Sequence, residues 1–153
     1  MADIAKRLVE LGIELPPVAT PAGAYVPAIR SGVHVYTSGQ LPLVDGKLRR
    51  TGKVGADVTL EDAYDDARQA ALNALAAIDN LVGLDKVTKV VKVVGFVASD
   101  PSFTKQPLVI NGASELLGEV FGEAGKHARS AVGVAVLPID TPVEVEVIVE
   151  VSE

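Results

Sequence analysis

The chain has no cysteine and no tryptophan, and aromatic residues make up only 4% of its 153 positions. Without cysteine it can form no disulfide bond, no thiolate nucleophile and no cysteine-bound zinc site. Its two histidines, His34 and His127, stand too far apart in the sequence to form a metal-ligand motif. No apolar run reaches the roughly 20 residues of a membrane-spanning helix, and the charged first residues lack a secretory signal. We therefore expect a cytoplasmic protein without a membrane partner.

The composition favours one domain with an aliphatic core. Hydrophobic residues are 48% of the chain, so valine, leucine, isoleucine and alanine must build that core. The formal net charge of −6 argues against a nucleic-acid-binding surface, which normally carries an excess of lysine and arginine. We expect a single domain over residues 1–153, with an additional N-terminal helix at 1–14 and a proline-containing linker at 15–23.

Two later segments have helical periodicity. Thr59 and Asp62 make a capping-box-like start, and alanines then recur at helical spacing until Gly83, a residue type suited to a helix end. Small residues on one face let a helix lie close against a sheet. The second helix is predicted from Leu108 to Phe121, with leucine, valine and phenylalanine on its apolar side.

The remaining apolar segments have the composition of β-strands. The predicted order is three strands, a helix, a strand, a helix and two final strands. Two helices can cover only one face of such a sheet, which indicates an α+β layer architecture. The predicted strands are residues 25–30, 34–38, 47–54, 87–98 and the two strands between His127 and Val151.

The segment between Arg129 and Pro138 is apolar on both of its alternating faces. A strand of this kind needs cover on both sides, and one face of the sheet has no predicted helix to cover it. We infer that the second face of the sheet meets another subunit. In a closed homo-oligomer, strand ends of neighbouring chains would then border a shared cleft.

Arg129 lies at the start of this strand, and Glu144 and Glu146 alternate with valines in the next one. A guanidinium that grips a carboxylate at two points, beside a carboxylate that moves a proton, is typical of a site for small organic acids. The alternative is that Arg129 ends a strand at the surface while the glutamates face water. Composition alone does not distinguish Glu144 from Glu146.

Three motifs in order point to a known family. They are Tyr36–Pro42 (YTSGQLP), Asn111 with Glu115, and Arg129-Ser130 followed by alternating valines and Leu137-Pro138. Over about residues 18–151 the chain resembles the RidA/YjgF/YER057c/UK114 family. Its longer N-terminus is similar to a divergent branch whose members are often labelled endoribonuclease L-PSP or translation inhibitor.

The resemblance implies a chorismate-mutase-like α+β fold, with two helices packed on one face of a mainly antiparallel mixed sheet. It also implies a homotrimer whose sheets face a central barrel, with three clefts between subunits. Family members typically hydrolyse reactive enamines and imines, such as 2-aminoacrylate, to 2-keto acids and ammonia. The resemblance implies no metal and no organic cofactor.

The resemblance also implies roles for individual residues. Arg129 matches the arginine that binds the substrate carboxylate, and Glu144 matches the glutamate that positions or activates water. Ala131 stands where active members usually carry cysteine, and its backbone matches a position that touches ligand or water. Further positions that match cleft-lining residues, each with packing or a local hydrogen bond as its alternative role, are Tyr25, Ser38 and Asn111.

Other functions stay open at this point. The same cleft could bind a small carboxylate or keto acid without turnover, and a chaperone-like role through apolar strands is compatible with the composition. A ribonuclease or translation inhibitor is disfavoured, because there is no histidine pair and the basic cluster has no interleaved aromatics for base stacking. That basic cluster consists of Lys47, Arg49, Arg50 and Lys53.

Overall fold

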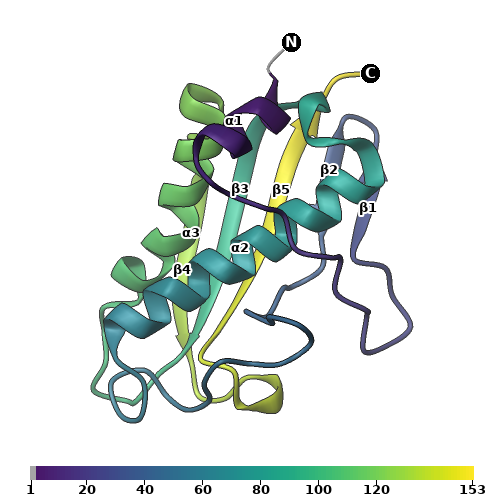
Figure 1. The fold of residues 1–153 in the computed structure, drawn as a ribbon. Helices are drawn as coiled ribbons and strands as arrows, with labels where there is room; N and C mark the ends of the chain where they lie inside the picture. Colours follow the sequence, from purple (N-terminus) through teal and green to yellow (C-terminus); the bar gives the residue numbers. More distant parts are fainter. Residues whose placement is uncertain (1–2) are drawn as a thin grey trace.

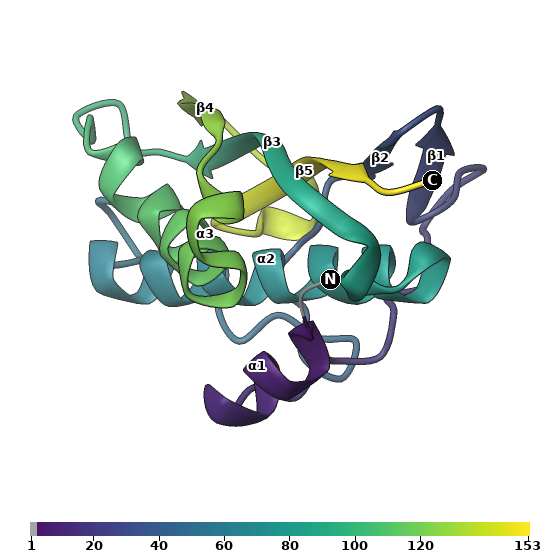
Figure 2. The same ribbon diagram turned by 90° about the horizontal axis from the view of Figure 1, so that it is seen from above.

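The computed structural model describes residues 3–153 as a five-stranded sheet with two long helices on one face (Figures 1 and 2). The strand order is β1-β2-β5-β3-β4, and all neighbours are antiparallel except the parallel pair β3–β4. The predicted α+β class with a mainly antiparallel mixed sheet is confirmed. The elements are α1 (Ile4–Glu10), β1 (Ala28–Ser31), β2 (His34–Thr37), α2 (Leu60–Val82), β3 (Val87–Ala98), α3 (Gln106–Phe121), β4 (Ala128–Val134) and β5 (Val143–Val151).

Helix α2 begins and ends where the sequence predicts. The Thr59 hydroxyl accepts a hydrogen bond from the Asp62 backbone N–H at 3.1 Å, and the chain leaves the helix at Gly83, with φ +84°. The alanine face of α2 is buried, and its small side chains let neighbouring segments pack close to the helix. A side chain at Gly112 of α3 would place its Cβ 3.0 Å from the Tyr64 carbonyl carbon, so the two helices touch through their backbones.

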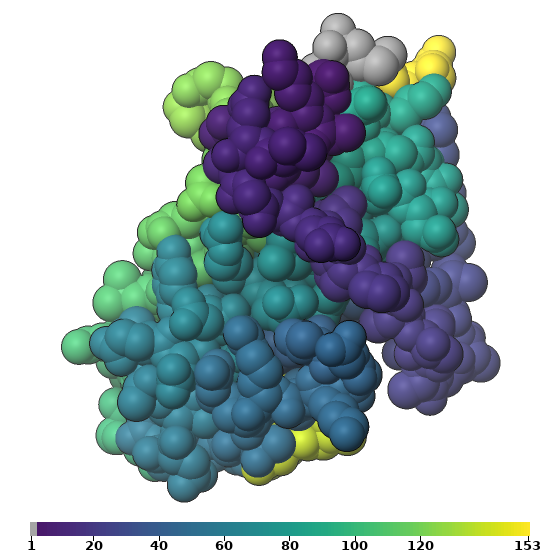
Figure 3. Space-filling view, in the orientation of Figure 1, coloured from purple at the N-terminus to yellow at the C-terminus, as the bar shows by residue number. Residues whose placement is uncertain are grey.

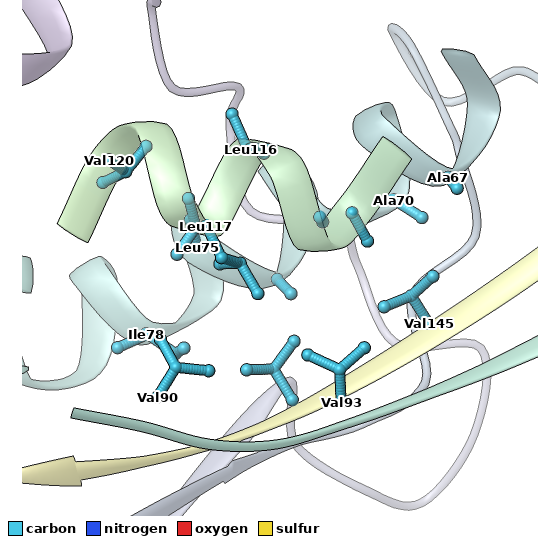
Figure 4. Packing of buried hydrophobic residues seen from close by; sticks show 14 of the residues in the cluster. Ala67, Ala70, Leu75, Ile78, Val90, Val93, Leu116, Leu117, Val120 and Val145 are labelled. Atoms are coloured by element: carbon cyan, nitrogen blue, oxygen red, sulfur yellow. The ribbon is translucent and has the colours of Figure 1, made fainter. Parts of the chain in front are cut away.

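The core lies between these helices and the sheet (Figure 4). Strand β5 alternates strictly, with its valines buried and its intervening residues partly exposed. This is the period of two expected for a strand with one face against a core. The labelled core residues in Figure 4 are Ala67, Ala70, Leu75, Ile78, Val90, Val93, Leu116, Leu117, Val120 and Val145.

The N-terminal helix packs outside the helix layer, and the segment after it crosses that layer (Figures 2 and 3). Ile4 and Leu8 are buried, the Ile4 N–H donates to Asp85 Oδ1 at 2.7 Å, and Arg7 Nε donates to the Glu119 carbonyl at 2.8 Å. The helix is shorter than the predicted 1–14, because the chain turns at Gly12 with φ +68°. Residues 1 and 2 of that prediction lie outside the described residues.

Two strand predictions are wrong in part or whole. The predicted strand 25–30 begins only at Ala28, because Pro27 has no N–H to donate; instead its carbonyl accepts from the Ser38 N–H at 2.8 Å. The predicted strand 47–54 is a loop. Only isolated bridges, such as Val54 with Ser99, tie it to the sheet, and its basic side chains pair with carboxylates. The second long helix also begins two residues earlier than predicted, at Gln106.

The sheet face opposite the helices is uncovered in the single chain (Figure 2). Ile29, Tyr36 and Ile148 occupy one row across three strands, and Ile29 is 59% exposed. At the opposite edge of the sheet, on the same open face, Val132 of β4 is 44% exposed. An apolar sheet face left open to water is typical of an interaction surface.

Candidate functional site

The structure gathers the predicted site residues into two groups, each of which also includes residues that were not predicted. The first, the arginine cluster, consists of Arg129 of β4 with Asn111 and Ser114 of α3 and His127 just before β4. The second, the glutamate cavity, has a volume of about 450 Å³ and is lined by Ala22, Tyr25, Ser38, Gly39, Leu41, Pro138 and Glu144.

Arg129 points toward the helix layer, at the edge of the sheet. It pairs in register with Val93, which is fully buried under the helices. Its Nη1 donates to Asn111 Oδ1 at 2.8 Å and to Ser114 Oγ at 3.2 Å, and its Nη2 donates to the Pro107 carbonyl at 3.3 Å. Asn111 is therefore a direct partner of the arginine rather than a separate element of the site.

The guanidinium keeps donors for a ligand. It carries five N–H groups, and three of them make the bonds to α3. The Nε–H and one Nη2–H make no hydrogen bond to residues 3–153. Two donors on adjacent nitrogens match the two oxygens of a carboxylate. Ala131 lies two residues further along β4, on the same face, and packs against the core.

In the glutamate cavity, the carboxylate of Glu144 lies directly over Gly39. A Cβ at Gly39 would stand 2.8 Å from Glu144 Cδ, so the absence of a side chain there makes room for the acid. Burial raises the pKa of Glu144 above its ordinary value, and the nearby charge of Glu146 raises it further. A carboxyl group of this kind takes up a proton more readily than a free glutamate does.

The two glutamates of β5 differ in their surroundings. Glu144 is the one carboxylate in the lining of this cavity among the described residues, whereas Glu146 lies outside it. Both are on the face of β5 opposite the buried valines. Position along the strand therefore puts Glu144, and not Glu146, in the lining of this cavity.

Tyr25 and Ser38 line the same cavity but already have local bonds. The Ser38 hydroxyl donates to the Val26 carbonyl at 2.6 Å, and the Tyr25 hydroxyl accepts from the Ala22 N–H at 3.3 Å. These bonds hold the segment that leads into β1 against the cavity wall. A lone pair of the Ser38 oxygen remains able to accept a hydrogen bond.

Within the single chain, Arg129 and Glu144 do not meet. Glu144 pairs in register with Phe96, three residues beyond the Val93 that pairs with Arg129. An odd number of residues along a strand changes the face, so the two side chains project from opposite faces of the sheet. Strand β3 also lies between their strands.

Sequence reasoning missed Ser114 and His127 as site residues. Ser114 Oγ is 2.9 Å from His127 Nε2 and also accepts from Arg129. A signal was present, because His127 and Arg129 are two residues apart, as are side chains on one face of a strand. Asn111 and Ser114 are three apart, as are side chains on one face of a helix.

No cluster of three or more histidines and acidic residues with metal-binding geometry occurs in residues 3–153. Within the same range, no helix has the length and apolar character needed to cross a membrane.

Comparisons with known proteins agree on one family. The family model described as "YjgF/chorismate_mutase-like, putative endoribonuclease" matches residues 5–151. Protein TCP17 of Trypanosoma cruzi is 46% identical over 151 residues, which cover 97% of this chain and 94% of that protein. The 2-iminobutanoate/2-iminopropanoate deaminase of Salmonella typhimurium is 38% identical over 128 residues, which cover 82% of this chain and 86% of that protein. Among solved structures, Atu1372 from Agrobacterium tumefaciens, a protein of unknown function, has 48% sequence identity and a TM-score of 0.90. The match covers 97% of this chain and 92% of that one.

Proposed function

Since the chain belongs to the YjgF/chorismate-mutase-like family, we propose that it hydrolyses reactive enamines and imines of the 2-aminoacrylate type to 2-keto acids and ammonia. One observation carries the proposal. Arg129 is held by α3 through Nη1 and keeps donors on Nε and Nη2 for a carboxylate. The deaminase relative, 38% identical, acts by its name on 2-imino acids, which carry a carboxylate of this kind.

The active assembly in this proposal is a homotrimer with clefts between subunits. The arginine cluster and the glutamate cavity lie on opposite faces of one sheet, so neither encloses a ligand alone. A neighbouring copy that covers the open sheet face brings the glutamate cavity of one chain to the arginine cluster of the next. The exposed Val132 and Tyr36 are apolar residues that such a contact would bury.

The proposed chemistry needs two groups in each cleft, one that holds the substrate and one that transfers protons. Arg129 grips the carboxylate and so fixes the position of the neighbouring imine carbon. 2-Aminoacrylate first tautomerises to the imine, as a proton moves from its nitrogen to its terminal carbon. Water then attacks the imine carbon, and the carbinolamine so formed collapses to the keto acid and ammonia. Glu144 takes the proton from the attacking water and passes it to the departing nitrogen. Its raised pKa suits it to exchange a proton in both directions, a contribution of about 10²–10⁴-fold in typical enzymes.

The proposal can be tested in a coupled assay. A dehydratase generates 2-aminoacrylate in situ, and the release of pyruvate is followed over time. We expect Arg129→Ala to abolish the acceleration, and Arg129→Lys to restore little of it, because an ammonium lacks the planar two-point fork. Arg30→Ala is the matched control. Within residues 3–153, the Arg30 side chain on the far edge strand donates to two backbone carbonyls and to no side chain, so full activity is expected. Full activity of Arg129→Ala would refute the proposal.

A binder without catalysis is the second candidate. The arginine cluster supports it, because the remaining Nε and Nη2 donors of Arg129 can bind the carboxylate of a keto acid without any contact to Glu144. Glu144→Gln separates the two. Loss of turnover with retained pyruvate affinity supports hydrolysis, whereas a wild-type protein that binds pyruvate and never accelerates the reaction supports the binder.

The charge distribution does not support an endoribonuclease, the activity in the family's description. Arg50 Nη1 lies 2.7 Å and Arg49 Nη2 3.1 Å from Asp66 Oδ1, and Lys53 pairs with Asp140. Asp66 is 1% exposed, so these cations hold a loop onto α2. With Asp62, which also lies near Arg50, three carboxylates balance the three cations, so the loop offers little net charge to phosphate groups.

A further inference from the structure

His127 is held at both ring nitrogens, and this determines where its proton lies. Nδ1 is 2.6 Å from the Gly125 carbonyl oxygen, which can only accept a hydrogen bond. Nδ1 therefore carries the proton and donates it. In the neutral ring, Nε2 then presents a lone pair toward Ser114.

The carbonyl that sets this tautomer is itself held in place. Gly125 is buried in the 3-10 turn 122–125 that follows α3, and a Cβ there would stand 2.9 Å from the Leu117 carbonyl carbon and 3.2 Å from Gly118 Cα of that helix. Because the backbone of Gly125 packs directly on the helix backbone, its carbonyl has little freedom to turn. The imidazole is therefore anchored to the same helix that carries Ser114.

The tautomer of His127 also determines the donor and the acceptor in the two hydrogen bonds of Ser114. Ser114 Oγ lies 2.9 Å from His127 Nε2, so the hydroxyl donates to the ring. Its oxygen then keeps lone pairs for Arg129 Nη1, which can only donate and lies at 3.2 Å. The chain runs from the guanidinium N–H to Oγ, from the hydroxyl to Nε2, and from Nδ1–H to the Gly125 carbonyl.

We propose that His127 is a positioning residue for Arg129 and acts through the Ser114 hydroxyl; this rests on the proposed role of Arg129 as the carboxylate anchor. With its proton held by His127, the hydroxyl presents only lone pairs to the guanidinium. Ser114 and Asn111 then occupy both protons of Nη1. The rotation of the guanidinium about its own axis is fixed, and the donors of Nε and Nη2 face the ligand.

A serine inside a helix ordinarily turns its hydroxyl to the carbonyl four residues earlier. Here His127 competes for that proton. Without the imidazole, the Ser114 hydroxyl loses its fixed direction and the guanidinium loses one of its two orienting partners on Nη1. We expect weaker carboxylate binding rather than loss of the fold, because His127 and Ser114 are only partly buried.

The experiment uses ¹⁵N NMR of the histidine rings in the full-length protein. The chain has two histidines, so His34→Gln leaves His127 as the only ring signal. At a pH where the ring is neutral, we expect the Nδ1–H tautomer, with Nε2 unprotonated. Pyruvate, the probe, should shift the His127 signals in wild type and leave them unmoved in Arg129→Ala. An Nε2–H tautomer in the free protein would overturn the proposal.

Calorimetric titration with pyruvate measures how much each variant changes the binding affinity. Loss of one hydrogen bond is worth about a 2- to 12-fold change in an equilibrium constant, so we expect His127→Phe and Ser114→Ala to weaken binding by that factor. Ser114→Thr keeps the hydroxyl and should restore affinity, an outcome that a purely structural role for the serine would not produce. Thermal melting of each variant checks that the fold is intact.

The outcomes separate the two claims. If pyruvate binds wild type, and His127→Phe and Ser114→Ala bind it equally well, the positioning role is wrong while Arg129 keeps its proposed function. If wild type binds pyruvate no better than Arg129→Ala, the proposed function fails and the positioning role fails with it.

Discussion

Gly39→Ala is a sharp probe of the proposed role of Glu144, because it perturbs that carboxylate without changing it chemically. The new Cβ would stand 2.8 Å from Glu144 Cδ, closer than real Cβ contacts, and 3.1 Å from Cγ, tighter than most of them. Gly39 does not have the positive φ that disfavours other residues, so the alanine backbone itself is unstrained. The three atoms nearest to the new Cβ all belong to the Glu144 side chain, which is flexible and can move. We therefore expect a displaced carboxylate in a folded protein.

The expected kinetic effect follows from what the displaced group contributes. General acid–base assistance accounts for about 10²–10⁴-fold, so kcat for imine hydrolysis should fall by up to that factor. The affinity for pyruvate should change little, since Arg129 lies on the opposite face of the sheet. Turnover of 2-aminoacrylate and calorimetric binding of pyruvate measure the two quantities separately.

A double-mutant cycle decides whether the loss passes through Glu144. If it does, Gly39→Ala combined with Glu144→Ala should be no slower than Glu144→Ala alone. Gly118→Ala is the matched control, because its added methyl meets nothing within 4 Å and lies far from the cavity lining. Unchanged kcat in Gly39→Ala would refute the reasoning, as would losses that simply add in the double variant.

Four further predictions concern the pH profile, the stability and the assembly of the protein. The pKa of Glu144 is raised by burial and by Glu146, so the acid limb of kcat/KM should lie above the ordinary glutamate range; Glu146→Gln should move it to lower pH, and an unmoved limb would exclude the coupling. A raised carboxyl pKa also means that the folded state binds this proton more tightly than the unfolded state does. Ionised Glu144 therefore costs stability as pH rises through the window from the unfolded to the folded pKa, and Glu144→Gln should raise the melting temperature at neutral pH. Gly112→Ala should destabilise by about 1–3 kcal/mol, because its Cβ meets the backbone of Tyr64. Gly118→Ala on the same helix should instead stabilise by about 0.5–1 kcal/mol, and chemical denaturation that ranks the two variants equally would contradict the packing argument. Val132→Asp, on the exposed sheet face, should give a folded monomer without deaminase activity in sedimentation and turnover assays; a fully active monomer would rule out the shared cleft.

Local patterns were enough to predict much of the fold. Thr59 and Gly83 mark the ends of α2, because a helix terminus is decided by hydrogen bonds and dihedral angles of adjacent residues. The strict alternation of Val143–Val151 predicts a strand with one buried face for the same local reason. The strand predicted at 47–54 was wrong, because ion pairs with Asp66 and Asp140 hold this segment as a loop. Those partners are distant in the sequence, so no local pattern indicates them.

The site shows where local reasoning ends. The sequence by itself determined which residues are present for the chemistry: an arginine at the start of an apolar strand, a pair of glutamates on an alternating strand, and a resemblance that ranked Glu144 first. Only the tertiary structure decided that Glu144 lies over Gly39, that His127 reaches Arg129 through Ser114, and that Arg129 and Glu144 project from opposite faces. Strand order and register bring these groups together or apart, and both depend on contacts between segments that are distant along the chain.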